Sequence, residues 1–168
     1  MTAVRPLSSD AHAKVGHRAK RSRDAFAARV CKAAGALKLA KSRELPGRLA
    51  QVYSELSAEL ERWQPDQVAI EEVFYSVNAK SALKLGQVRG VALLAAANHG
   101  LPVAEYAPLS IKSCVVGYGL AKKEQVQFMV ARLLNLPQLP EPADAADALA
   151  IAITSHSSNA SRGAFGRK

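Results

Sequence analysis

The spacing of apolar positions changes repeatedly after residue 35. Leu45, Leu49, Val52, Leu56 and Leu60 recur at helical intervals, with charged residues on the other side. Short apolar runs bounded by turn residues are typical of strands. This alternation of strands and helices indicates an α/β domain. The pattern predicts strands at residues 36–39, 67–71 and 101–106, helices at 45–60, 78–98, 111–116, 123–134 and 143–155, and a loop at 137–142.

The two ends of the chain differ from this central domain. Residues 1–34 are basic and show no sustained period, so we expect an atypical segment that is irregular or disordered. Residues 35–156 form the expected folded domain. Residues 157–168 are polar and contain glycine, which predicts a flexible tail.

The net charge narrows the range of partners. The 168 residues carry a formal charge of +9, with a pI near 9.8, which favours nucleic acid or another anionic surface. Cys31 and Cys114 lack the spacing of a zinc site or a disulfide framework. No apolar run approaches the ~18 residues that cross a bilayer, and the N-terminus lacks the apolar core of a secretion signal. We therefore expect a cytoplasmic protein.

Three carboxylates stand against an apolar background. Glu71 ends a predicted buried strand, where site residues of open α/β sheets gather, although it could equally emerge into solvent. Asp144 and Asp147 are three residues apart and share one helix face. They could simply complement the helix dipole, but the surrounding alanines indicate burial, where two like charges repel without a cation. The metal interpretation is slightly favoured.

Carboxylates in a basic protein point to phosphate chemistry. Magnesium prefers oxygen ligands and combines a few carboxylates with water and substrate phosphates. Two such ions ~4 Å apart can activate water and stabilise the leaving oxygen in phosphodiester hydrolysis. Glu71, Asp144 and Asp147 are thus candidates for a nuclease site.

Candidate DNA contacts lie between the acidic motifs. The ring of Phe74 could wedge into a base step, although core packing is the alternative for either Phe74 or Tyr75. Lysines and arginines could hold phosphates or could simply cover a solvated helix face. The basic candidates are Lys80, Lys84, Arg89, Lys112 and Lys123. The 80–98 helix is apolar on more faces than one sheet can cover, which suggests a homodimer interface.

Four motifs, in this order, closely resemble the RuvC family of bacterial crossover junction endodeoxyribonucleases. They are residues 69–74 (AIEEVF), 78–90 (NAKSALKLGQVRG), 115–119 (VVGYG) and 144–150 (DAADALA). The likeness extends from about Gly35 to His156.

The resemblance implies an RNase H-like fold, in which helices flank a mixed sheet, and a homodimer joined through its long central helices. It implies metal-dependent resolution of four-way DNA (Holliday) junctions in recombination and repair, with Mg²⁺ or Mn²⁺, two ions per subunit. Glu71, Asp144 and Asp147 would be the metal-binding catalytic carboxylates. Phe74 would face DNA, and Lys112 and Lys123 would lie near the scissile phosphate. The RuvA–RuvB branch-migration complex would be a further partner.

One family feature is absent from the chain. The family begins with a strand similar to Gly-Ile-Asp-Pro-Gly, whose Asp is the first catalytic carboxylate, and no such segment occurs here. Neither Asp10 nor Asp24 lies in an apolar strand, so neither takes this role. We therefore expect the N-terminal strands to be missing or replaced, on the hypothesis that residues 1–34 come from a shifted reading frame or a mis-set start. The alternative function is a junction-binding dimer with impaired cleavage.

Overall fold

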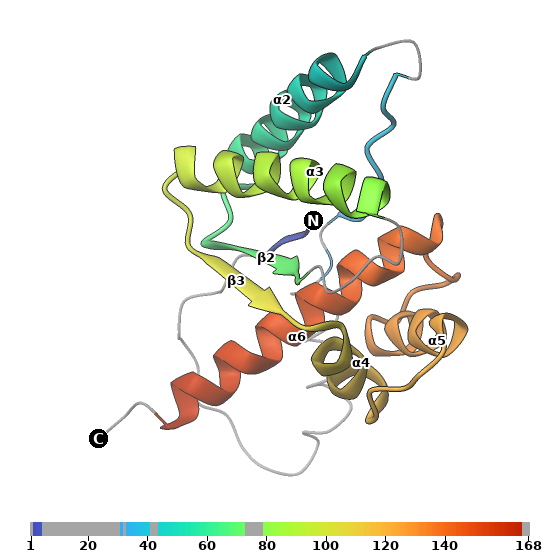
Figure 1. Cartoon of the computed structure of the whole chain (residues 1–168). Helices are drawn as coiled ribbons and strands as arrows, with labels where there is room; N and C mark the ends of the chain where they lie inside the picture. Colours follow the sequence, from blue (N-terminus) through green and yellow to red (C-terminus); the bar gives the residue numbers. More distant parts are fainter. Residues whose placement is uncertain (1, 5–30, 32, 41–43, 73–78, 166–168) are drawn as a thin grey trace.

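A computed structural model describes residues 2–4, 31, 33–40, 44–72 and 79–165 of the chain (Figure 1). The strands are β1 (Thr2–Val4), β2 (Gln67–Glu71) and β3 (Val103–Tyr106). The helices are α2 (Leu45–Trp63), α3 (Ala79–Asn98), α4 (Pro108–Val116), α5 (Lys123–Leu133) and α6 (Ala143–Phe165).

The described strands form one mixed sheet in the order β1-β2-β3. β2 pairs in parallel with β3, so the chain must cross over between them, and α3 makes that crossover. β1 pairs with β2 in the antiparallel direction, with Ala3 opposite Val68. β2 is therefore the central strand.

The two faces of β2 pack against different helices (Figure 1). Val68 and Ile70 contribute to a cluster with buried residues of α2 and α3. Ala69 contributes to a second cluster with residues of α4, α5 and α6. Because strand side chains alternate between faces, Glu71 belongs to the same face as Ala69, toward α6. The apolar alternation therefore directs Glu71 to α6.

Local sequence accounts for both ends of α4 and for the start of α5. Pro108 stands in the first turn of α4, where its missing N–H is harmless. Gly117 ends α4 with a φ of 97°, a left-handed conformation that suits glycine. At the start of α5, the Lys122 backbone N–H donates to Gln125 Oε1, 2.8 Å away, and the Tyr118 hydroxyl donates to the same oxygen. These contacts fix the entry to α5.

Most predicted elements are confirmed, within a few residues at their ends. The predicted strand at residues 36–39 is wrong, since this segment has no strand pairing. Its backbone instead bonds to a side chain of α2: Ala40 N–H donates to Gln51 Oε1, and Gln51 Nε2 donates to Lys38 O. The strand Thr2–Val4 was not expected, because three residues are too few to show a period.

The last helix is longer than predicted. It was expected to end at Ser155, and α6 continues to Phe165, so most of the expected flexible tail is helical. Ala152, Ile153 and Ser155 are buried in its middle, which anchors the helix well beyond its first turns. In the part of the chain described here, no helix is long and apolar enough to cross a bilayer.

Candidate active site

Glu71 reaches the site from the carboxyl end of β2. Its backbone lies opposite Tyr106 of β3, and its side chain is half-buried. The pKa of Glu71 is raised above its ordinary value, mainly by burial and then by the negative charge of Asp147. The positive charges of Lys112 and Lys123 act in the opposite direction. Glu71 and Asp147 therefore experience each other's charge across β2 and α6.

Asp144 and Asp147 lie in the first turns of α6. The Ala145 N–H donates to the Pro142 carbonyl, 2.8 Å away, where the helix begins. Ala145 and Ala146 are buried between the two aspartates, whereas the Asp144 side chain is 86% exposed and that of Asp147 is 43% exposed. The helix thus buries its alanines and leaves both carboxylates open to solvent. The predicted burial of the alanines is confirmed, but the expected burial of the two carboxylates is wrong, since both side chains remain accessible to solvent.

Lys123 joins α5 to both aspartates. Its Nζ lies 2.9 Å from Asp147 Oδ2 and 3.3 Å from Asp144 Oδ1. The pKa of Lys123 is raised, first by the hydrogen bond to Asp147 and further by the charges of both aspartates, against a lowering by burial. One cation already bridges the two carboxylates. The sequence indicated Lys123 as a phosphate contact, but no local pattern could reveal this contact with α6.

These residues form one electrostatic group contributed by four elements. We call Glu71, Asp144 and Asp147 the acidic cluster; Lys112 of α4 and Lys123 of α5 act on its charge. The sheet and α6 bring Glu71 within range of the charge of Asp147, although the two are more than seventy residues apart in the sequence. Every ion pair described here between α5 and α6 involves Lys123.

The donor set suits a hard divalent cation. All three members of the acidic cluster offer carboxylate oxygen, which Mg²⁺ and Mn²⁺ prefer. In the described residues, no three His, Cys, Asp or Glu side chains approach closely enough to form a complete metal cage. Magnesium needs no such cage, because water and substrate phosphates usually complete its coordination. The oxygen atoms of Asp144 and Asp147 lie close enough to hold the Lys123 ammonium between them, and their chemistry fits a hard divalent cation.

The acidic cluster has no carboxylate neighbour from β1. The strand beside β2 is Thr2-Ala3-Val4, which contains no Asp or Glu. The expectation that the N-terminal strands are missing or replaced stays a prediction, because residues 5–30 lie outside the described residues. Asp10 and Asp24 lie outside the described residues.

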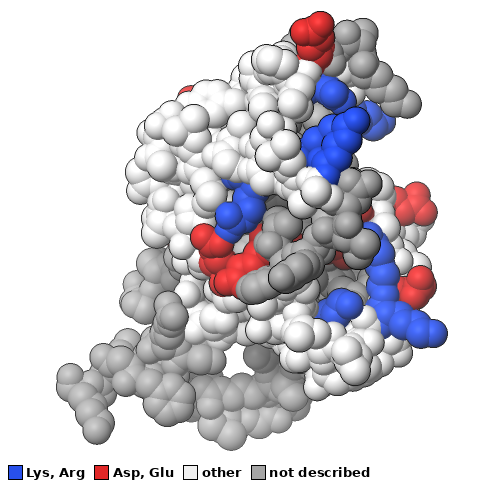
Figure 2. Space-filling view, viewed as in Figure 1, with Lys and Arg blue, Asp and Glu red and all other residues white. Residues whose placement is uncertain are grey.

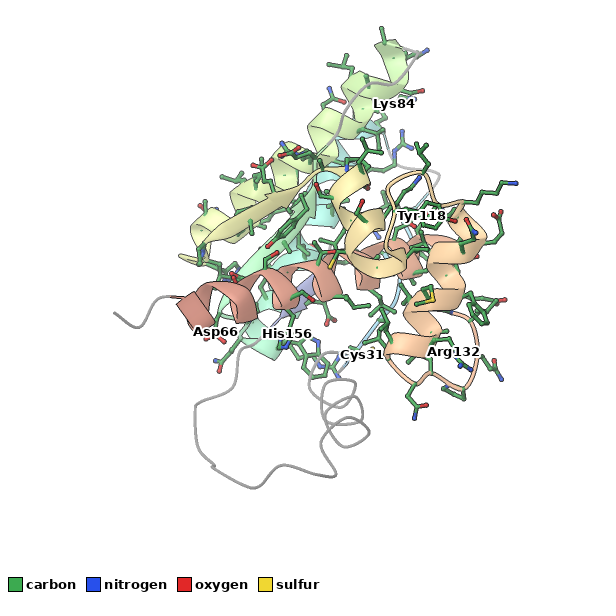
Figure 3. The ribbon with its side chains drawn as sticks, turned by 90° about the horizontal axis from the view of Figure 1, so that it is seen from below. Cys31, Asp66, Lys84, Tyr118, Arg132 and His156 are labelled. Atoms are coloured by element: carbon green, nitrogen blue, oxygen red, sulfur yellow. The ribbon has the colours of Figure 1, made fainter. Side chains whose placement is uncertain are left out.

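The remaining DNA-contact candidates occupy different positions. Lys80 and Lys84 are exposed near the start of α3, and Figure 3 shows Lys84 far from His156 of α6. Arg89 forms an ion pair with Glu105 of β3, with only 24% of its side chain exposed. Phe74 lies outside the described residues. Sequence reasoning missed Glu105, because nothing in the local pattern marks a strand residue as the partner of a helix residue.

Charge and apolar surface are unevenly distributed. Figure 2 shows lysine and arginine side chains on the upper, central and right-hand parts of one face, with an acidic group at the centre and further acidic side chains at the top and right edge. α3 exposes several large apolar side chains, which are Leu83, Leu85, Val88 and Leu94. Large contiguous apolar patches mark protein interfaces, whereas singly exposed leucines are ordinary.

Known proteins resemble this chain over most of its length. Residues 23–156 match the family model described as crossover junction endodeoxyribonuclease RuvC, a match that begins earlier than the expected Gly35. The chain is 73% identical over 119 residues to that enzyme of Acidobacterium capsulatum, covering 71% of this chain and 70% of the relative. It is 64% identical over 123 residues to the enzyme of Koribacter versatilis, covering 73% and 74%.

Solved structures of RuvC share the fold of this chain. RuvC of Thermus thermophilus superposes with a TM-score of 0.67 at 36% identity, over 76% of each chain. The structure of T. thermophilus RuvC in complex with Holliday junction substrate gives a TM-score of 0.69 at 36% identity, over 75% of this chain and 76% of that one. The expected RNase H-like α/β fold is confirmed. The chain belongs to the RuvC family of crossover junction endodeoxyribonucleases.

Proposed function

We propose that this chain is a metal-dependent endonuclease that resolves four-way DNA junctions in recombination and repair, with the acidic cluster as its catalytic site. The observation that carries this proposal is that Glu71 of β2 lies within range of the charge of Asp147 of α6, while Lys123 bridges Asp147 and Asp144. Family membership supports the same activity. The DNA-bound relative supports junction DNA as the substrate.

Each group in the site has a definable task. The three carboxylates would hold Mg²⁺ or Mn²⁺, with two ions per subunit. When bound, the metal supplies activation of the attacking water and stabilisation of the leaving oxygen. Lys112 and Lys123 place positive charge beside the acidic cluster, where it would hold the scissile phosphate near the carboxylates.

The remaining DNA contacts would extend along α3. Exposed Lys80 and Lys84 supply charge for backbone phosphates, and Phe74 would contact a base step. Arg89 would contribute through its guanidinium only if it leaves Glu105. The phosphate contacts would fix the position of the protein on the junction. They would not select a sequence, because phosphate contacts carry no sequence information directly.

The working assembly would be a homodimer joined through α3. The exposed Leu83 and Leu94, which share one side of α3, would be covered by a second copy, which would give two sites related by a twofold axis. Each subunit would cut one strand at symmetric positions on the junction. RuvA–RuvB would supply the junction, and the cytoplasm, where bacterial DNA lies, would be the location.

A cleavage assay tests this function. A synthetic four-way junction with labelled strands is incubated with the chain and Mg²⁺, beside a linear duplex of the same sequence. The expected result is a pair of symmetric nicks in the junction and none in the duplex, abolished by Glu71→Gln. Tight junction binding without nicks would instead support the impaired binder. That alternative is not favoured, because the chain retains Glu71, Asp144 and Asp147.

A further inference from the structure

The Lys123 ammonium bridges one carboxylate oxygen of each aspartate of α6. Its Nζ contacts Asp147 Oδ2 at 2.9 Å and Asp144 Oδ1 at 3.3 Å. Both contacts are charge-assisted hydrogen bonds, which are stronger than neutral ones. A divalent cation bound between the same oxygens would place its charge against this ammonium. Both cations cannot take these contacts together, because like charges at such distances repel.

The lysine can leave without disturbing the helix that carries it. Lys123 is the first residue of α5, and the helix start is fixed by the Gln125 side chain, which accepts from the Lys122 N–H and the Tyr118 hydroxyl. Tyr118 lies on the segment that leads from α4 to α5 (Figure 3). The Lys123 side chain is 47% exposed, and a flexible four-carbon stem carries its ammonium. Its ammonium can therefore exchange partners while α5 stays in place.

We propose that Lys123 is a displaceable counter-ion that competes with divalent metal for Asp144 and Asp147 and becomes available to the DNA phosphate when metal binds. This inference rests on the proposed function, since it takes the acidic cluster as the metal site. It gives the lysine two successive partners. Metal binding would then be coupled to phosphate capture, because the cation that enters releases the ammonium.

Lys112 provides the matched comparison. It also carries one positive charge close enough to Glu71 to lower the pKa of that carboxyl. No ion pair joins it to Asp144 or Asp147 within the residues described by the structure. Substituting either lysine changes the net charge by one, but only the Lys123 change removes a direct competitor.

Titration calorimetry of Mn²⁺ binding measures the competition. The full chain is stripped with EDTA and compared with Lys123→Gln, Lys112→Gln, Lys123→Arg and Asp147→Asn. Lys123→Gln should bind Mn²⁺ about 5- to 10-fold more tightly than the unsubstituted chain, and Lys112→Gln about two- to threefold more tightly. Lys123→Arg keeps the cation and should show no gain. Since Lys123 is half-exposed, a circular dichroism melt should show all lysine variants folded.

The release of the ammonium is tested by DNA binding. Ca²⁺ serves as a divalent cation in place of Mg²⁺, and junction affinity is measured with Ca²⁺ and with EDTA. The gain from Ca²⁺ should be at least about threefold larger for the unsubstituted chain than for Lys123→Gln, since only the former has an ammonium to release. Equal gains would overturn the coupling.

The outcomes separate this inference from the proposed function. If Asp147→Asn weakens Mn²⁺ binding while Lys123→Gln leaves it unchanged or weakens it, the competition is contradicted and the metal site stands. A gain for Lys123→Gln that does not exceed the gain for Lys112→Gln would also contradict it. If Asp147→Asn leaves Mn²⁺ binding unchanged, the metal site fails and the inference fails with it.

Discussion

At the scale of single residues, Glu71 is held in an environment that disfavours its charge. Burial is the main cause of its raised pKa, and Asp147 adds to it. When the folded-state pKa of a carboxyl exceeds its unfolded-state pKa, ionisation of that carboxyl destabilises the folded state. Near neutral pH the charge of Glu71 therefore opposes folding, and this cost disappears as pH falls through the folded pKa toward 4.5. A cation near Glu71 relieves the same cost.

We predict that Glu71→Gln stabilises the fold at neutral pH in EDTA. The gain should be less than about 1 kcal/mol, because the side chain keeps part of its hydration, and it should vanish below about pH 4. Thermal melts of both proteins between pH 4 and pH 8 measure it. A melting temperature at pH 7 that is lower for Glu71→Gln than for the unsubstituted chain would refute this electrostatic description.

The ion pair of Arg89 with Glu105 gives a second residue-scale prediction. The pair links α3 to β3, with side chains that are 24% and 42% exposed. A double-mutant cycle with Arg89→Gln and Glu105→Gln should yield a coupling energy of about 0.5–1 kcal/mol in denaturant unfolding. If Arg89 instead serves only DNA, the coupling will be absent and Arg89→Gln alone will weaken junction binding.

The sequence predicted the acidic residues better than their surroundings. Glu71, Asp144 and Asp147 stand out because carboxylates are uncommon in segments rich in alanine and valine. The contacts of Lys123 with α6 could not be predicted, since they depend on how two helices pack. The roles of the three carboxylates stay predictions until they are tested by mutation.

At the scale of elements, α6 supports the whole site. It contacts all three strands as well as α4 and α5, and it carries both aspartates at its start. Leu149, two residues after Asp147, is 1% exposed within the cluster formed with α4 and α5. The position of the acidic cluster therefore depends on the packing of this helix.

We predict that Leu149→Ala destabilises the fold by about 2–5 kcal/mol, the usual cost of a cavity at a buried leucine. Urea unfolding followed by circular dichroism measures this loss. Leu139→Ala is the control, because Leu139 is 53% exposed and should change stability by less than about 0.5 kcal/mol. Similar losses for the two variants would contradict the assigned core.

The elements show where pattern reasoning works. The sequence predicted α2 and α3 because apolar residues recur over several helical turns. It predicted β2 because a short apolar run is bounded by turn residues. β1 could not be predicted, since its pairing with β2 is a long-range contact of three residues. The segment 36–39 has the composition of a strand. The Lys38 carbonyl and the neighbouring Ala40 N–H instead form hydrogen bonds with the Gln51 side chain of α2.

At the scale of the whole molecule, the exposed apolar face of α3 predicts a dimer. Leu83 is 65% exposed, so Leu83→Glu should place a charge in the interface and yield monomers. Leu139→Glu is the matched control, because Leu139 is similarly exposed but lies outside α3. Light scattering after gel filtration distinguishes the species. A dimer that survives Leu83→Glu would move the interface away from this part of α3.

The central claim is that the acidic cluster cuts junction DNA. The most direct test is single-turnover cleavage of a four-way junction with Mg²⁺ by Asp147→Asn, measured beside binding of the same junction with Ca²⁺. Asp147 contacts Lys123 and acts on Glu71, so its loss should reduce the cleavage rate by more than about 100-fold. Junction affinity should stay within about threefold of the unsubstituted chain. A cleavage rate that survives Asp147→Asn would contradict the assignment of this cluster as the catalytic site.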